Sequence, residues 1–460
     1  AVEYLRDLPG VTVLTSGSRG RQTDVAIRGT NANQTLVLID GARVNNPNQG
    51  NFNFNSLSSD NIERIEVLRG PQSALYGSDA IGGVINIITK KGKGPPKATA
   101  QFEYGTQMTF HETASLEAGW EKVNVSGSFD RLDTEGRSLD DEFDSTNASA
   151  RLGVDIFQRL DLDSTFRYSK NKIDIDDGPF RVDPNRFTRN KGVIVTNKLH
   201  GLVGDAWDHT LQGTYTHGAS LSVDPPDPGV RGLTSTFKVD SNIYDVNYFN
   251  TLPTWDFGTF TSGVEYIYQW ANNKTFSRIL RTTGVYGEEL MEFWDRLNVV
   301  AGCRIENSSQ FGVPTDPHIS AAYKIKETGS KIKGGFGTGF RAPTLNQLFF
   351  PNFGNPNLEP EESVSYDIGW EQSVTEYGTL EIDLFHTSIE NLIQSVPVRP
   401  GVSLATNTGK AVINGMEMQS TWRLFQNAMN LRLYYELLFT EDKSFEGKEL
   451  TRRPKHAGGV

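Results

Sequence analysis

From about residue 98 onward, hydrophobic and polar positions alternate along the chain with a period of two. In 98–105 the hydrophobic residues occupy the even positions, and the same alternation recurs in 123–130 and 160–168. Successive side chains of a strand point to opposite faces, so this pattern predicts strands with one apolar face. Such strands suit a membrane barrel, with lipid outside and water inside. A soluble sandwich alternates in the same way, usually with shorter strands.

The polar linkers between these strands alternate between short and long. The short ones are 121–122, 155–159, 205–209, 326–330 and 373–378; the long ones are 131–146, 169–192, 218–240, 341–362 and 387–409. Outer-membrane barrels have short periplasmic turns and long external loops, so the asymmetry favours a barrel and sets its orientation. This pattern predicts about 18 strands, an even number as in other such barrels.

The first 92 residues follow a different pattern. An alternating segment from Ile62 leads into Arg69-Gly70-Pro71, where glycine allows unusual backbone angles and proline fixes the next φ. The pair Gly82-Gly83 then opens a β-branched run that reads as a buried strand. Upstream, 36–39 is a short apolar strand that ends at the turn signal Asp40-Gly41. These short strand and turn signals set the first 92 residues apart from the alternating region.

Residues 62–92 (IERIEVLRGPQSALYGSDAIGGVINIITKKG) resemble the plug domain of TonB-dependent outer-membrane receptors. Residues 2–10 resemble the helix and turn that begin this domain, and 25–41 (VAIRGTNANQTLVLIDG) carry its IRG and VLIDG motifs. Further along, 335–370, with FRAP and NPNLEPE, and 406–420 (TNTGKAVINGMEMQS) resemble barrel motifs of the same family. The resemblance implies a mainly β protein, a transmembrane antiparallel β-barrel with an N-terminal α+β plug domain inside it. We expect the plug in 1–95 and the barrel in 96–460.

The resemblance also implies that this sequence is a fragment. Ala1 lies where the family's plug helix begins, so we expect the signal peptide and the TonB-binding segment upstream. The family barrel has 22 strands, so roughly four strands are expected after Val460.

Composition narrows the functional classes. The net charge of −11 argues against a nucleic-acid partner. The single Cys303 excludes an internal disulfide framework and a multi-cysteine metal site, and we expect an inert strand residue. No GxSxG, HExxH or P-loop motif occurs, so we do not expect an enzyme, and no cofactor is required.

The resemblance implies ion pairs between plug and barrel. The family pairs the arginines of the IRG and LRGP motifs with acidic residues on the inner wall, and these positions correspond to Arg28, Arg69, Asp367 and Glu417. The family usually has glutamate where Asp367 stands, so a longer contact is expected there. The alternative is that the two arginines bind plug backbone carbonyls.

Two further groups could bind ligands. Asp174, Asp176, Asp177 and Asp183, in 170–187, suit a hard cation such as Ca²⁺, although acidic loops are usually only solvated. Asparagine and aromatic side chains of plug and loops suit a neutral, polar ligand. The candidates are Asn45, Asn46, Asn48, Gln49, Phe52, Phe54, Phe349 and Phe350. An asparagine-rich turn, and loop phenylalanines that pack on their own loop, are the alternatives.

The resemblance implies TonB-dependent active transport of cobalamin or a ferric siderophore across the bacterial outer membrane. Its partners would be TonB, the small-molecule ligand and membrane lipid. A passive porin and a secreted β-rich adhesin or binding protein are the alternatives, and the plug-like segment 1–92 argues against a porin.

Overall fold

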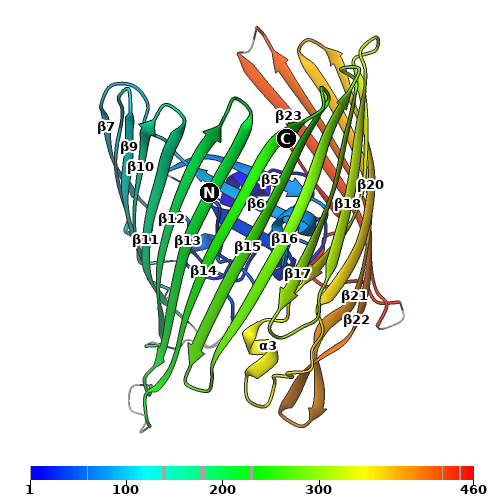
Figure 1. Ribbon diagram of the computed structural model, residues 1–460. Helices are drawn as coiled ribbons and strands as arrows, with labels where there is room; N and C mark the ends of the chain where they lie inside the picture. The colour runs from blue at the N-terminus through cyan, green and yellow to red at the C-terminus, as the bar shows by residue number, and fades with distance from the viewer. Residues whose placement is uncertain are drawn as a thin grey trace.

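The structure is a computed structural model that describes residues 2–59, 61–136, 141–175, 183, 185–227, 232–426, 428–444 and 447–460. It consists of a small N-terminal domain, here called the plug, which lies inside a wall of long antiparallel strands (Figure 1). The last plug strand ends at Thr89 and the first wall strand begins at Lys97.

The plug is an α+β domain of two small sheets. Its elements are α1 (Val2–Arg6), β1 (Val11–Thr15), β2 (Thr23–Ile27), β3 (Thr35–Ile39), β4 (Ala42–Arg43), β5 (Ile62–Arg69), α2 (Ser73–Tyr76) and β6 (Gly83–Thr89), with 3₁₀ turns at Ala32–Gln34 and Phe54–Ser56. β1 and β2 form a hairpin, while the main sheet has the order β4-β3-β6-β5, with β3 and β6 parallel. Both predicted apolar runs are strands of this sheet, β3 and β6.

The plug has a hydrophobic core of its own. Ile27, Val37, Ile39, Ile85 and Ile87 are almost completely buried and pack together, because β3 and β6 lie in the middle of the sheet and are covered on both faces. Asp40 and Gly41 both have positive φ and turn the chain from β3 into β4. The predicted turn therefore brings Arg43 to the edge of the sheet.

The wall contains the remaining strands in chain order, each antiparallel to its neighbour. They are β7 (Lys97–Gly105), β8 (Thr109–Gly119), β9 (Val123–Thr134), β10 (Phe143–Phe157), β11 (Leu160–Asp174), β12 (Phe187–Val203), β13 (Trp207–Asp224), β14 (Ser235–Thr254), β15 (Gly258–Asn273), β16 (Ser277–Phe293), β17 (Leu297–Ser308), β18 (Thr315–Ile325), β19 (Ser330–Arg341), β20 (Glu361–Thr375), β21 (Gly378–Arg399), β22 (Val402–Leu424), β23 (Met429–Asp442) and β24 (His456–Gly459). The described residues thus contain about the number of strands that the alternation predicts.

The two rims of the wall differ as predicted. One rim, at the top of Figure 1, has short turns such as 120–122, 158–159 and 204–206. The opposite rim carries the long segment 342–360 with the short helix α3 (Leu345–Phe349). We call these the short-turn rim and the long-loop rim.

The predicted long loops are too wide, and one of them is wrong. Residues 387–409 belong to β21 and β22, which stay paired, with register shifts after Ile389, Leu392 and Pro397, up to a two-residue turn at 400–401. β9, β11 and β13 likewise run several residues into predicted loops. Paired strands satisfy their backbone hydrogen-bonding groups whatever their side chains, so polar residues on both faces do not by themselves end a strand.

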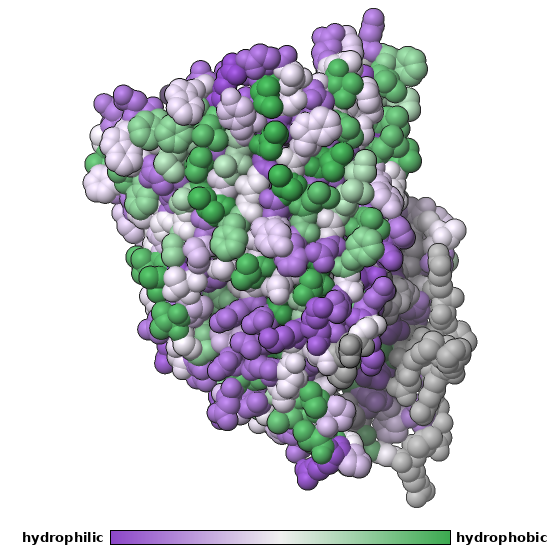
Figure 2. Space-filling model, turned by 90° about the vertical axis from the view of Figure 1, so that its right-hand side faces the viewer, coloured by the Kyte–Doolittle hydropathy of each residue, from purple (hydrophilic) through white to green (hydrophobic). Residues whose placement is uncertain are grey.

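The outer face of the wall is apolar and aromatic. Hydrophobic residues form a broad band there, with hydrophilic residues at the short-turn rim and below the band toward the long-loop rim (Figure 2). Trp120, Trp207, Trp255 and Trp294 are exposed at or next to short turns, as in the aromatic girdle of a membrane barrel. Cys303 also points outward, on β17. No helix among the described residues is long and apolar enough to cross a membrane.

Gly83, where β6 begins beside β5, tests how tightly the plug is packed. It has φ of +145°, and a Cβ there would lie 2.1 Å from the carbonyl oxygen of Leu68. We expect Gly83→Val to lower the free energy of plug unfolding by about 3 kcal/mol, because the neighbour is backbone and cannot move away. Thermal unfolding and protease resistance in detergent would measure this. Gly213→Ala, on β13 with open space around it, is the control; equal stability of both variants would contradict the prediction.

Candidate functional site at the plug–barrel interface

The first cluster of charges joins β2 of the plug to β22 of the wall. Arg28 follows the last residue of β2, and its backbone N–H donates to the carbonyl of Gly10 at 2.7 Å. Its guanidinium donates from Nε and Nη2 to the two carboxylate oxygens of Glu417, at 3.0 and 3.3 Å. Both side chains are almost fully buried, and Arg28 also lies 4.5 Å from the ring centre of Phe385. This is a bidentate, buried pair of the kind that fixes geometry as well as charge.

Arg69 and Asp367 complete this cluster at longer range. Arg69 Nη1 lies 3.8 Å from Glu417, and Arg28 Nη1 lies 4.0 Å from Asp367. Glu417 therefore lies between two plug arginines, while the shorter Asp367 makes the longer contact. Burial opposes the charge of Arg28, but Glu417 and Asp367 outweigh it and raise the pKa of Arg28 above its usual value. The structure thus brings together all four residues named from the family motifs.

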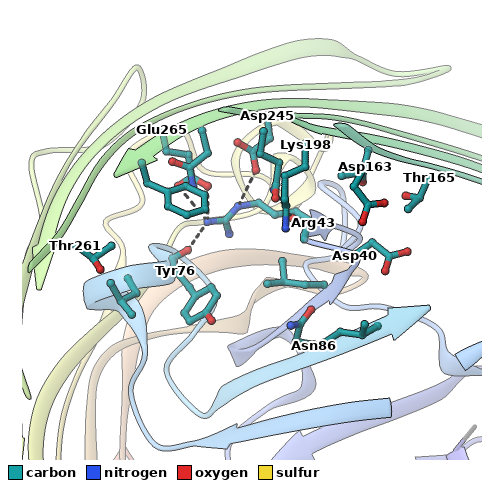
Figure 3. Close-up of a pocket in the computed structure, with 18 of the residues that line it drawn as sticks. Asp40, Arg43, Tyr76, Asn86, Asp163, Thr165, Lys198, Asp245, Thr261 and Glu265 are labelled. Atoms are coloured by element: carbon teal, nitrogen blue, oxygen red, sulfur yellow. Dashed lines mark hydrogen bonds and ion pairs between the residues drawn. The ribbon is translucent and has the colours of Figure 1, made fainter. Parts of the chain in front are cut away.

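A second cluster was not anticipated from the sequence. Arg43, on β4, has Nε 3.7 Å from Asp245 on β14 and Nη2 3.4 Å from Glu265 on β15 (Figure 3). Its guanidinium also donates to the backbone carbonyl of Tyr76. Burial opposes the charge of Arg43, but Glu265 and Asp245 raise its pKa above the usual value. We call Arg43 with Asp245 and Glu265 the Arg43 bridge.

The wall supports this bridge with a cation of its own. Arg304 on β17 is completely buried, pairs with Glu265, and donates from Nε to Glu306 at 2.9 Å. It also reaches the carbonyl of Leu75 in the plug at 3.4 Å. Glu265 thus receives one arginine from the plug and one from the wall, which offsets the cost of burying it.

A third buried pair lies at the base of the segment with α3. Arg341 of the FRAP motif donates to both oxygens of Glu361 of NPNLEPE, at 2.7 and 2.6 Å. Gln34 of the plug donates to the same carboxylate at 2.8 Å. The two motifs that mark the barrel therefore hold each other and the plug together.

A cavity of about 470 Å³ separates part of the plug from the wall (Figure 3). Its plug side includes Asp40, Arg43, Tyr76 and Asn86, and its wall side includes Asp163, Thr165, Lys198, Asp245, Thr261 and Glu265. The lining also contains an ion-pair network: Arg151 on β10 pairs with Asp163 of the wall at 2.7 Å and with Asp40 of the plug at 3.5 Å. Such a lining suits water or a polar solute rather than an apolar one.

Some proposed ligand-binding residues have structural roles. Asn45 is buried, accepts from the N–H of Val37 and donates to the carbonyls of Thr35 and Gly50. Phe54 is only 1% exposed and belongs to the plug core, and Phe52 packs against that core. Internal bonds and burial thus give Asn45 and Phe54 a structural role in this structure, and ligand contact by these two residues stays a prediction. From sequence alone, a turn whose asparagines bind a ligand cannot be distinguished from one whose asparagines bond to the turn's own backbone.

The other candidates lie where two loops meet. The N–H of Leu345 in α3 donates to the carbonyl of Pro47 at 3.0 Å, so the plug turn with Asn46, Asn48 and Gln49 contacts the segment that carries α3. Gln49 is exposed, and Asn48 is buried with both amide atoms unpartnered within the described part of the chain. Phe349 and Phe350 are half-buried against a cluster that includes Leu345 of their own segment and Ala271 and Leu280 of the wall, so they pack on more than their own loop. Their role in ligand binding stays a prediction.

The proposed calcium residues do not form a ligand set in the described chain. Asp176 and Asp177 lie outside the described residues. Asp174 pairs with Lys172 at 2.8 Å, and Asp183 accepts from the N–H groups of Asn185 and Arg186. Among the described residues no group of three or more metal-binding side chains occurs. Calcium binding stays a prediction, and no step of the function is derived from it.

The wall residues of the second cluster, which the sequence analysis did not name, have a weak signature in the sequence. Glu265 and Arg304 stand at lumen-facing positions of alternating strands, flanked by apolar residues that face outward, and Glu306 lies two residues after Arg304 on the same face. A charge in the middle of such a strand is buried against the plug and needs a partner. The pattern therefore marks them as candidates, but it does not say which plug residue meets them.

Comparisons with known proteins agree with this architecture. The family model "TonB dependent receptor-like, beta-barrel" matches residues 119–460, and "TonB-dependent Receptor Plug Domain" matches 1–84. The chain is 28% identical over 477 residues to the vitamin B12 transporter BtuB of Photobacterium profundum, covering 98% of this chain and 75% of that one. It is 26% identical over 445 residues to BtuB of Vibrio vulnificus, covering 91% and 69%.

Among solved structures, the fold is similar to that of the copper transporter OprC, with a TM-score of 0.83 at 15% identity, covering 96% of this chain and 78% of that one. It is also similar to the siderophore receptor PirA of Acinetobacter baumannii, with a TM-score of 0.81 at 18% identity, covering 99% and 80%. At these identities the likeness shows the fold alone.

A double-mutant cycle tests the first cluster. We expect Arg28→Met and Glu417→Gln each to destabilise plug seating by about 3–5 kcal/mol, because each leaves a buried charge or acceptor unpaired. The double variant should lose much less than the sum. Arg69→Met with Glu417→Gln should show weaker coupling, since Arg69 is farther from Glu417 and more exposed. Protease resistance of the plug during thermal unfolding would be measured for all five variants, the three single and the two double ones. Additive effects in the Arg28 cycle would contradict the pairing.

Proposed function

This chain belongs to the TonB-dependent receptors, transporters for nutrient uptake, and we propose that the nutrient it carries is a cobalamin. The observation that carries the proposal is the similarity to two vitamin B12 transporters over nearly the whole chain. The siderophore receptors and the copper transporter share the fold at lower identity, which does not identify a ligand. We further propose that the protein lies in the bacterial outer membrane, with its long-loop rim outside.

The external side of the plug supports a neutral, polar ligand. Gln49 and the buried amide of Asn48 belong to a plug turn in contact with the α3 segment, where Phe349 and Phe350 are half-exposed. Amide groups supply donors and acceptors without net charge, and aromatic rings supply flat apolar area. A cobalamin carries amide side chains around a flat ring system, so its chemistry matches this combination.

Transport requires the plug to move, and the buried charges oppose that movement. Breaking a buried pair by withdrawing one partner costs about 3–5 kcal/mol. The plug is held in this way at Glu417 and again at Glu265. Spontaneous opening is therefore rare, and work from outside the domain is needed. We propose TonB as the partner that supplies this work.

This arrangement distinguishes the protein from a passive channel. Arg28, Arg43 and Gln34 each reach from the plug to a carboxylate on a different part of the wall. A lumen filled by a domain that is bonded to its wall does not conduct until those bonds are exchanged. A binding step that weakens them on the external side is the simplest way to couple ligand to opening.

A binding experiment tests the proposed ligand. We expect the full-length protein in detergent to bind cyanocobalamin in calorimetry and a ferric siderophore much more weakly. Gln49→Ala should weaken cobalamin binding about tenfold, equivalent to about 1.4 kcal/mol. Gln158→Ala is the matched control, because Gln158 is an exposed glutamine in the turn 158–159 on the opposite rim. Siderophore binding in preference to cobalamin would reject the proposed ligand.

A further inference from the structure

Two cavities follow one another along the boundary between plug and wall. The cavity of about 470 Å³ lies in the half of the wall near the short-turn rim, and a smaller one of about 40 Å³ lies beyond it toward the long-loop rim. The order is clear on β15, which starts at the short-turn rim. Thr261 and Glu265 line the larger cavity, and Ile267 and Gln269, further along the same face, line the smaller one.

Arg43 lines both cavities. From β4 its side chain crosses to Asp245 and Glu265, so the Arg43 bridge closes the space between plug and wall at the point where one cavity ends and the other begins. The side of the smaller cavity nearest the outside is formed by Pro47, Ala342 and Thr344, the place where the plug turn meets the α3 segment. The two cavities therefore lie in line from the proposed ligand side toward the short-turn rim, and Arg43 lines both of them.

We propose that the Arg43 bridge is an inner gate of the transport path, which runs between the plug and the wall strands that line the two cavities, β10–β16 at the larger one and β15–β17 at the smaller one. This inference rests on the proposed transport function and adds where the ligand passes and which residues close its way. The larger cavity has the volume of an ordinary ligand site, whereas the smaller one has room for little more than water. Opening therefore requires the plug to withdraw Arg43 and widen the outer part of the path.

The charges around the bridge suit a gate that closes again. When Arg43 leaves, Arg304 still pairs with Glu265 and Glu306, so the wall side keeps its geometry. Asp245 then loses the plug cation that lies 3.7 Å away. A buried carboxylate without its cation is costly, and this cost favours the return of Arg43.

Conductance of the full-length protein in planar lipid bilayers tests the gate without any ligand. We expect Arg43→Met to give a steady ionic leak where the unaltered protein is sealed. Arg151→Met is the matched control: Arg151 also bridges plug and wall, through Asp40 and Asp163, but it lines only the larger cavity and should leave the seal intact. A sealed Arg43→Met protein, or equal leaks in both variants, would overturn the inference.

A milder variant protects the test against misfolding. Heat-modifiable migration would show whether Arg43→Met assembles. If it does not assemble, Asp245→Asn is tested instead, because this variant keeps the ion pair of Arg43 with Glu265. Its conductance should exceed that of the unaltered protein but stay below that of a fully open path. A sealed Asp245→Asn protein would then reject the gate. The proposed ligand is tested separately. If the protein does not bind cobalamin, the proposed ligand is rejected, but the conductance results, which are obtained without ligand, still decide whether the gate exists.

Discussion

The position of the plug depends on one constraint: a guanidinium buried inside the barrel needs a carboxylate beside it. Arg28 and Arg43 are both less than one-tenth exposed, and each is bonded to acidic residues of the wall. An unpaired charge there would cost several kcal/mol, so the plug can sit only where both arginines meet their partners at once. The orientation of the plug sheet, the cavity beside it and the contact of the Pro47 turn with the α3 segment are all consistent with this placement.

The plug differs in character from its boundary with the wall. Inside the plug, isoleucine and valine side chains of β2, β3 and β6 pack as in an ordinary domain core. At the boundary, hydrogen bonds and ion pairs such as those of Gln34, Arg28 and Arg151 join plug and wall, beside one apolar cluster in which Ile81 of the plug packs with wall residues such as Ile413. Water can replace polar contacts of this kind, whereas an apolar boundary would lose its burial when the domains part. A polar boundary therefore lets a well-packed plug move without unfolding as a whole.

The two main charge clusters lie on different parts of the wall. Glu417 belongs to β22 and Asp367 to β20, whereas Asp245 and Glu265 belong to β14 and β15. The clusters share no residue, so one can open while the other remains formed. This separation allows a ligand path on the Arg43 side while the Arg28 side still holds the plug.

The sequence by itself determined the strands, their outward face and the family. Alternation with a period of two is local, and so are the turn signals at Asp40-Gly41 and the motifs that contain Arg28, Arg69 and Glu417. The ends of the strands could not be read from local sequence. Residues 387–409 have the composition of a loop, but β21 and β22 remain paired up to their turn. Only the tertiary structure revealed the Arg43 bridge, because no motif links Arg43 to Glu265 across 222 positions, whereas motifs named Arg28 and Glu417 across 389. The requirement for a partner can be read from a buried charge, but the partner is chosen by how the plug sits in the barrel.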